Sequence, residues 1–299
     1  MTIRFGVSPI AWINDDMPEL GGDTAVKTVL EEARAAGFSG IELGGKFPRN
    51  PDQLRALLGA YDLALVGGWY SASLLTRTAD EEIAALRSHL RLLQALGSSV
   101  FVIAETSNAI HGHRQVALQG SPTLADDEWT RLGSRMTQVA DFIAGEGLRF
   151  AYHHHLGTVV ETGEELDRFL AVTGPSVGLT VDSGHAALGG INAADLISRA
   201  PERVAHVHCK DVRRSVFDGV TTRGGSFLEG VLAGMFTVPG DGDLDFGNVI
   251  QALASIDYSG WIVVEAEQDP AVADPKTYAK IGLDALRAEA GRFGLREAA

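Results

Sequence analysis

Four short apolar runs in the second half of the sequence end in groups that can bind a metal ion. These groups are His153, Asp182, His208 and Glu265. Imidazole and carboxylate ligands together suit a borderline divalent ion such as Mn²⁺, Co²⁺, Fe²⁺ or Zn²⁺. Magnesium or calcium prefers a pure oxygen shell, which would need more carboxylates. The residue types therefore indicate a site for one divalent cation.

Each of these groups, taken alone, also has a structural interpretation. An aspartate after a strand commonly caps the next helix, and a single histidine is more often only hydrogen-bonded. Side chains alternate along a strand, however, so every second residue faces the same way. The pairs expected on one face are His153 with His155, His206 with His208, and Glu265 with Glu267. Ligands on four successive strand ends favour a shared site over coincidence.

Other polar and aromatic side chains follow the same expected strands and are candidates for chemistry on a substrate. The candidates for acid–base work are Lys46, His155 and His185. The candidates for substrate contact are Trp12, Asn14, Glu42, Glu105 and Lys210. Aromatic residues such as Trp12 could equally be ordinary packing under the loops. The residues alone do not decide which group is the acid and which is the base.

Short β-branched runs alternate with amphipathic helical stretches along the whole chain. The expected strands are 3–8, 39–43, 63–68, 99–104, 148–153, 177–182, 203–209 and 261–265. The expected helices are 22–37, 50–61, 79–96, 126–145, 162–172, 192–199, 245–256 and 274–291. Near-continuous apolar strands, each followed by a helix, are typical of an α/β protein with a (β/α)8 TIM barrel. We predict one such domain over residues 1–299, with the polar groups at the C-terminal face of the barrel.

The main alternative is a doubly wound open sheet, which would place a glycine fingerprint after the first strand. The segment SPIAWIND that follows residue 7 is no such loop. Two connections, 105–125 and 211–244, are long enough to be lids or binding loops. Barrels with long loops often pair through them, so a homodimer and a homotetramer both fit the sequence.

Composition excludes several classes of partner. The chain has 299 residues, 45% of them hydrophobic and 21% charged, which is a globular composition. Its net charge of −14 repels a phosphate backbone, so no nucleic acid is expected. No apolar run approaches the roughly 18–20 residues that span a bilayer, so no membrane partner is expected. The single cysteine, Cys209, and an N-terminus without a signal-peptide pattern favour the cytoplasm.

At these residues the chain resembles the xylose-isomerase-like superfamily of sugar isomerases, epimerases and dehydratases. The matching stretches are VDSGHAAL, HVHCKD, VPGDGDLDF and GWIVVEAEQD. In that superfamily a Glu, an Asp, a His and a Glu bind one divalent metal, and Asp182, His208 and Glu265 match the last three positions. The first position departs from the pattern, because GLRFAYHHH places a histidine where the glutamate is expected. His153 is the assigned ligand, and His155 is the alternative by a two-residue shift.

Longer stretches resemble the dehydratases of inositol catabolism within that superfamily. They are SPIAWINDDMPELGGDT, ELGGKFPR, AYHHHLGTVVET, HVHCKDVR and VEAEQDP. The resemblance implies an enzyme, a lyase that uses Mn²⁺ or Co²⁺ and eliminates water from 2-keto-myo-inositol, a small polyol ketone, to give a trihydroxycyclohexane-dione. The alternative is a sugar or inosose isomerase or epimerase on the same barrel. A phosphodiesterase would need a basic groove, and a sugar-binding regulator would need an appended effector module that the sequence does not show.

Overall fold

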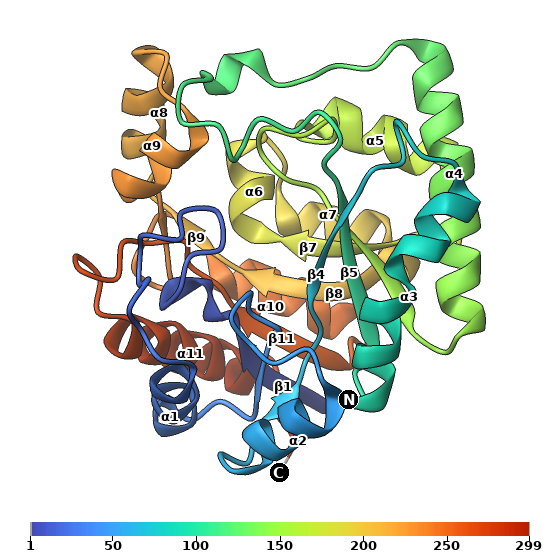
Figure 1. Cartoon of the computed structure of the whole chain (residues 1–299). Coiled ribbons are helices and arrows are strands. Elements are labelled where there is room, and N and C mark those ends of the chain that lie inside the picture. Colours follow the sequence, from blue (N-terminus) through green and yellow to red (C-terminus); the bar gives the residue numbers. More distant parts are fainter. Residues whose placement is uncertain (1, 299) are drawn as a thin grey trace.

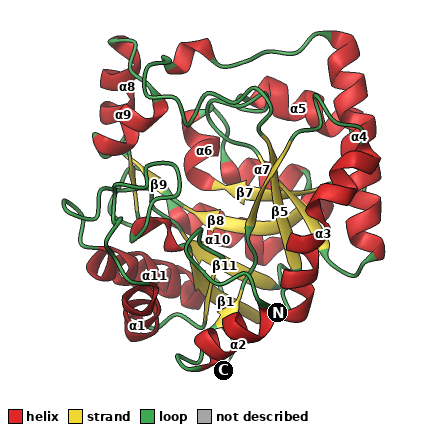
Figure 2. Ribbon diagram, in the orientation of Figure 1, coloured by secondary structure: helices red, strands yellow, loops and turns green. Residues whose placement is uncertain are grey.

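Parallel strands fill the middle of the molecule and helices surround them in the computed structural model, which describes residues 2–298 (Figures 1 and 2). The strands of the main sheet are β1 (Thr2–Val7), β2 (Gly40–Ile41), β3 (Ala64–Leu65), β4 (Trp69–Ala72), β5 (Val100–Glu105), β6 (Arg149–His153), β7 (Gly178–Asp182), β8 (Val204–Cys209), β11 (Gly260–Val264) and β12 (Arg296–Glu297). They lie in the order β3-β2-β1-β11-β8-β7-β6-β5-β4, and β12 pairs with the outer part of β1.

The third barrel strand is divided into two pieces, β3 and β4. Strand β3 pairs with β2, and strand β4 pairs with β5. The continuous segment 64–72 therefore connects the two ends of the sheet. Residues 66–68 separate the two pieces, and an added Cβ at Gly68 would lie 2.9 Å from Cβ of Leu43. The expected strand 63–68 therefore continues to Ala72. Within the described chain eight strand positions close into the expected barrel.

The eight expected helices are all present. They are α1 (Val26–Ala36), α2 (Pro51–Gly59), α3 (Ala79–Ala95), α4 (Asp126–Gly145), α5 (Gly163–Val172), α7 (Ala193–Arg199), α10 (Phe246–Ser255) and α11 (Pro275–Arg292). Helices α3 and α5 begin at capping boxes, which Thr78 and Thr162 each form with the glutamate three residues on. Helix α1 ends where Gly37 takes φ 107°. A short helix, α6 (Ser183–Leu188), was not expected and begins directly after β7.

The long connection 211–244 is an ordered excursion and not an open loop. It contains β9 (Asp211–Val212), α8 (Arg214–Thr222), α9 (Phe227–Leu232) and β10 (Phe236–Thr237), with β9 and β10 antiparallel. The connection 105–125 runs to it across the top of Figure 1, where Leu118 N donates to Gly225 O at 3.1 Å. The two long connections thus lie together along one side of the barrel mouth.

The barrel interior is packed below this mouth. Trp261, Val263 and Val66 form a small buried cluster inside the sheet. An added Cβ at Gly40 would lie 2.5 Å from the ring of Trp261, so the glycine leaves the space that the indole fills. The larger core lies between the strands and the surrounding helices. No helix in residues 2–298 is both long and apolar enough to cross a membrane.

Candidate active site

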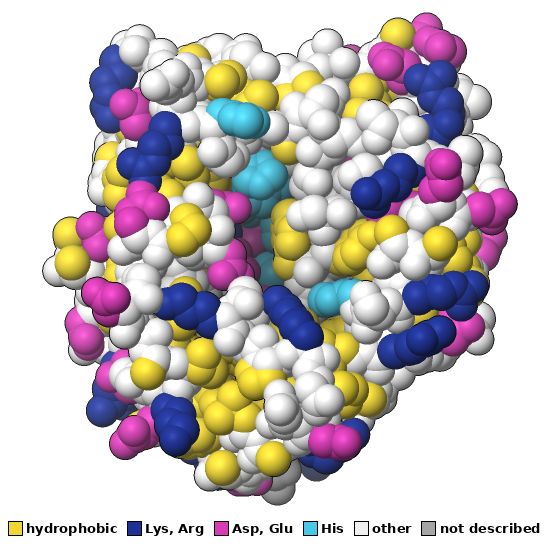
Figure 3. All heavy atoms as spheres, viewed as in Figure 1, with side chains coloured by type: hydrophobic (Ala, Val, Ile, Leu, Met, Phe, Trp, Pro, Cys, Tyr) yellow, Lys and Arg dark blue, Asp and Glu magenta, His cyan; other side chains and the backbone are white. Residues whose placement is uncertain are grey.

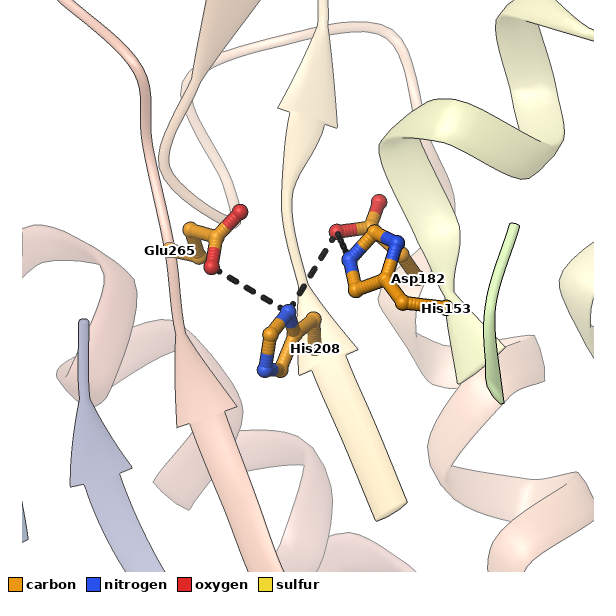
Figure 4. A group of neighbouring side chains, drawn as sticks. All are labelled: His153, Asp182, His208 and Glu265. Carbon is orange, nitrogen blue, oxygen red and sulfur yellow. Dashed lines mark ion pairs between the residues drawn. The ribbon is translucent and has the colours of Figure 1, made fainter. Parts of the chain in front are cut away.

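The expected metal ligands converge at the C-terminal ends of four adjacent strands. His153 ends β6, Asp182 ends β7, His208 lies on β8, and Glu265 follows β11 directly. Figure 4 shows the four side chains turned toward one another. All four are buried, and each offers a ligand atom within 4.8 Å of the others. The structure therefore brings together the set that the strand ends indicated.

Asp182 has two roles, because its two oxygens have different partners. Oδ1 accepts the backbone N–H groups of Gly184 and His185, both at 2.8 Å, and so caps α6. Oδ2 lies 3.6 Å from Nε2 of His153 and 3.7 Å from Nδ1 of His208. The capping interpretation of this aspartate is confirmed, and Oδ2 stays turned toward the other expected ligands.

Two atoms of the cluster fit a bound cation in particular. Oδ2 of Asp182 and Nδ1 of His208 are buried and have no hydrogen-bond partner. Buried polar atoms are normally paired, since leaving one unpaired costs about 1–3 kcal/mol. Oε2 of Glu265 also lies 3.1 Å from Nδ1 of His208. A divalent ion between these atoms would satisfy all of them, and the mixed nitrogen and oxygen donors suit one.

Glu42 holds the opposite side of the His208 ring. Its Oε1 accepts from Nε2 of His206 and from Nε2 of His208, each at 3.0 Å. With Nε2 protonated, His208 presents the lone pair of Nδ1 to Asp182 and Glu265. Burial acts against ionised Glu42, but the two histidines outweigh it and lower the pKa of Glu42 to about 2.

The carboxylates next to His208 favour positive charge at this position. Burial opposes charge on His208, yet Glu42 and Glu265 raise the pKa of this imidazole well above its usual value. The carboxylates that would hold a proton there would equally attract a divalent cation. Metal binding would then displace that proton.

A buried lysine sits beside the metal ligands. Nζ of Lys210 lies 2.5 Å from Oε1 of Glu265 and 2.6 Å from Oε1 of Glu267. It also lies 3.1 Å from Nε2 of His185 and 3.7 Å from Oδ2 of Asp182. Burial disfavours the ammonium, but the three carboxylates raise the pKa of Lys210 above its usual value. Burial raises the pKa of Glu267 to about 7, although Lys210 opposes this.

Aromatic rings frame His155 at the entrance. Trp69, His111 and Phe227 lie with ring centres 5.8, 4.8 and 5.1 Å from His155. Nδ1 of His155 is 2.7 Å from the carbonyl oxygen of Leu156 and donates to it. Burial lowers the pKa of His155 well below its usual value, so the ring is neutral at pH 7. Its Nε2 is then an unprotonated acceptor.

Several of these groups line a cleft at the barrel mouth, among them His153, His155 and Glu267. In Figure 3 histidine and acidic side chains gather in the hollow at the centre of the face shown. The carboxylates that line the cleft are Asp15, Asp16, Glu42, Glu265 and Glu267. No lysine or arginine is among the described lining residues. The cleft is thus a concave, acidic pocket with a few convergent polar groups, as small-molecule sites usually are.

Lys46 and Trp12, two of the expected site residues, lie outside this cleft. Lys46 is exposed, and its ammonium donates to the carbonyl of Gly22. Trp12 is buried, and its Nε1–H donates to Oε2 of Glu32 at 2.7 Å. Neither side chain lines the cleft.

Asn14 and Glu105 also lie outside the cleft, with structural contacts of their own. Oδ1 of Asn14 accepts from the backbone N–H of Met17 at 2.8 Å and fixes a turn. The Glu105 carboxylate accepts from the N–H groups of Leu74, at 2.6 Å, and Ser107, at 2.8 Å. Both residues stabilise loops next to strand ends. Glu42, His155, His185 and Lys210 are the expected residues that do join the cluster.

Four titratable residues that line the cleft were not in the expected site: Asp15, Asp16, His111 and Glu267. Glu267 could have been found, because it lies two residues after Glu265 and therefore faces the same way. Asp16 and His111 belong to irregular segments, where no periodicity indicates which way a side chain points. Asp16 and His111 line the cleft because their loops lie against the barrel mouth.

The fold and this site define a class of protein. A model of the xylose isomerase-like TIM barrel family matches residues 30–289, and the chain belongs to that family. A solved xylose isomerase domain protein from Alicyclobacillus acidocaldarius shares the fold with a TM-score of 0.69 at 19% identity, over 98% of this chain and 100% of that one.

Two curated relatives are much more similar in sequence. Rhizopine catabolism protein MocC of Rhizobium meliloti is 46% identical over 99% of this chain and 91% of its own length. Inosose dehydratase of Lacticaseibacillus casei is 41% identical over 93% of this chain and 94% of its own length. The resemblance to the dehydratases of inositol catabolism is thereby confirmed over nearly the whole chain.

Proposed function

We propose that this chain is a metal-dependent hydro-lyase that removes water from 2-keto-myo-inositol and forms a trihydroxycyclohexane-dione. The observation that carries the proposal is the buried set of four metal ligands in a chain 41% identical to an inosose dehydratase over 93% of its length. The cleft beside these ligands suits a small ring with several hydroxyl groups.

A single Mn²⁺ or Co²⁺ would be held by His153, Asp182, His208 and Glu265. When bound, it supplies a Lewis acid that polarises the ketone and stabilises the negative charge left when the neighbouring carbon loses its proton. The acidic cleft and the unpaired atoms of Asp182 and His208 support this assignment.

The elimination also needs a base for the carbon-bound proton and an acid for the departing hydroxyl group. His155 is the proposed base, because it lines the cleft, is neutral and keeps Nε2 unprotonated. Glu267 is the proposed acid, because it lines the cleft and its Oε2 has no partner. The O–H of Glu267 would donate to the leaving hydroxyl, which departs as water.

Lys210 and His185 lie behind these groups and hold them in place. The Lys210 ammonium contacts Glu267, Glu265 and His185 at 2.6, 2.5 and 3.1 Å. His185 in turn accepts from the backbone N–H of Leu156 at 3.2 Å. His185 thus connects the loop that carries His155 to the lysine, and its proposed role is to position both.

The test is incubation of the Mn²⁺- or Co²⁺-loaded protein with 2-keto-myo-inositol, followed by mass and ultraviolet absorbance. The proposal requires a product lighter by one water, with the new absorbance of a dione. A product of unchanged mass would show an isomerase or epimerase instead. The 46% identity to MocC favours a second candidate, a role in rhizopine catabolism, which a parallel incubation with rhizopine tests.

A further inference from the structure

A second group of metal-ligating side chains lies against the first. His155, His185 and Glu267 are buried and offer ligand atoms within 4.8 Å of one another. Glu267 is 2% exposed, and its Oε2 has no hydrogen-bond partner. By donor chemistry alone this group could hold a second divalent ion. The ammonium of Lys210 already lies at its edge.

We propose that the Lys210 ammonium takes the place of a second metal ion and so limits this barrel mouth to one divalent cation. Nζ of Lys210 contacts Glu267 and His185 of the second group and Glu265 of the first, at 2.6, 3.1 and 2.5 Å. A cation of fixed position therefore already bridges the two groups. The inference rests on the proposed function only in taking the first group as the metal site.

The charges around the lysine support a single ion. Asp182, Glu265 and Glu267 bring three carboxyl groups within 3.7 Å of Nζ. When Glu267 has given up its proton, the three carry −3 against one ammonium, which leaves a charge of −2. One divalent ion neutralises this remainder. Without the lysine the same carboxylates would carry −3, and one divalent ion would leave a buried charge unpaired, which is costly. The lysine therefore sets the number of metal ions that the site can hold.

The lysine is held too firmly to be displaced by an incoming ion. Its side chain is fully buried, and an added Cβ at Gly184 would lie 2.8 Å from its Cγ. Its Nζ lies 4.6 Å from the ring centre of Phe236. Its backbone N–H donates to Oγ of Ser183 at 3.0 Å, and that hydroxyl donates back to the Lys210 carbonyl at 2.8 Å.

The lysine also determines how Glu265 binds metal. Oε1 of Glu265 lies 2.5 Å from Nζ of Lys210, and Oε2 lies 3.1 Å from Nδ1 of His208. One oxygen is thus engaged by the ammonium and only the other faces the first group. We expect Glu265 to bind its metal through Oε2 alone.

The experiment measures metal stoichiometry by equilibrium dialysis against Mn²⁺ and elemental analysis, with electron paramagnetic resonance to detect coupled ions. Wild type should saturate at one ion per chain. Lys210→Ala removes the charge and opens the space, and it should bind two ions with a spin-coupled signal. Lys210→Met removes the charge but keeps the volume filled, and it should bind one. Lys210→Ala combined with His185→Ala should return to one ion.

One ion in Lys210→Ala at saturating Mn²⁺ would overturn the inference. If that variant is recovered unfolded, the wild-type titration decides: saturation at one ion supports the inference, and a second ion of comparable affinity contradicts it. A wild-type chain that binds one ion but releases no water from 2-keto-myo-inositol would contradict the proposed function and leave the stoichiometry standing.

Discussion

Oε1 of Glu42 lies 3.0 Å from Nε2 of His208, while Nδ1 of the same ring faces Asp182 and Glu265. The glutamate thereby fixes which ring nitrogen carries the proton and which one is free for a metal ion. Carboxylate–histidine–metal arrangements of this kind orient the ring and raise its basicity.

Removal of the Glu42 carboxylate should weaken metal binding without removing a ligand. For Glu42→Ala we expect a loss of roughly 10–100-fold in Mn²⁺ affinity, the usual effect of losing such a partner. Glu42→Gln keeps one carbonyl oxygen as an acceptor and should lose less. Competition with a coloured chelator measures both, and Glu81→Gln, at an exposed position of α3, is the control. Unchanged affinity in Glu42→Ala would refute this role.

His155→Gln tests the proposed base separately from the metal site. The glutamine cannot accept a proton from carbon, so kcat should fall by about 10²–10⁴-fold, the usual contribution of a general base. Because His155 is not among the four proposed ligands, one Mn²⁺ should still bind with an affinity within a few-fold of wild type. Steady-state kinetics and metal titration on one preparation provide both readouts. If metal binding is lost together with activity, His155 is the ligand that the two-residue shift suggested.

The acidic cleft should reject anionic substrates. Asp16 lines the entrance and has no positively charged neighbour among the described lining residues. We expect myo-inositol 1-phosphate to inhibit more weakly than myo-inositol, and Asp16→Asn to narrow that difference by roughly 3–10-fold, because one repulsive charge is removed. Asp80→Asn changes the net charge equally but does not line the cleft, so it should have no such effect. Inhibition constants at low and high salt give the measurement.

His89 should make the protein less stable in acid. Its Nε2 is 3.2 Å from the carbonyl oxygen of Gly68, and burial lowers the pKa of His89 from 6.5 to about 4. The unfolded chain binds a proton near pH 6.5 but the folded chain does not, so this contribution to stability is present above pH 6.5 and is lost as the pH falls toward 4. The expected loss is about 2 kcal/mol between pH 7 and pH 5.

His89→Gln keeps a donor for the Gly68 carbonyl but does not titrate. Urea unfolding of wild type and of this variant at pH 7 and pH 5 measures the difference. The variant should lose less stability than wild type over this interval. Equal losses would show that His89 does not cause the acid sensitivity.

The part of the site that the sequence could predict is the part on strands. Alternation paired His206 with His208 and Glu265 with Glu267, and both members of each pair do turn to the same partner: Oε1 of Glu42 for the histidines and Nζ of Lys210 for the glutamates. Strand order then placed the ligands side by side. The barrel itself followed from the alternation of apolar runs and helices.

Loops were the part that the sequence could not predict. Trp12 and Asn14 lie in the segment that follows β1, yet they turn to Glu32 and to the N–H of Met17. The side chain of a residue next to a strand end can point into the loop or into the cleft. Only the path of the loop backbone determines which of the two it does. The division of the third strand into β3 and β4 is similar, because the pairing of each piece with a different neighbour is not visible in the sequence.

The central claim is that one divalent cation binds among His153, Asp182, His208 and Glu265. Anomalous diffraction from Mn²⁺-loaded crystals, collected at the manganese edge, tests it most directly. The account predicts one strong peak per chain, about 2 Å from Nε2 of His153, Oδ2 of Asp182, Nδ1 of His208 and Oε2 of Glu265. A peak outside this group of side chains, or none in crystals grown with excess Mn²⁺, would contradict it.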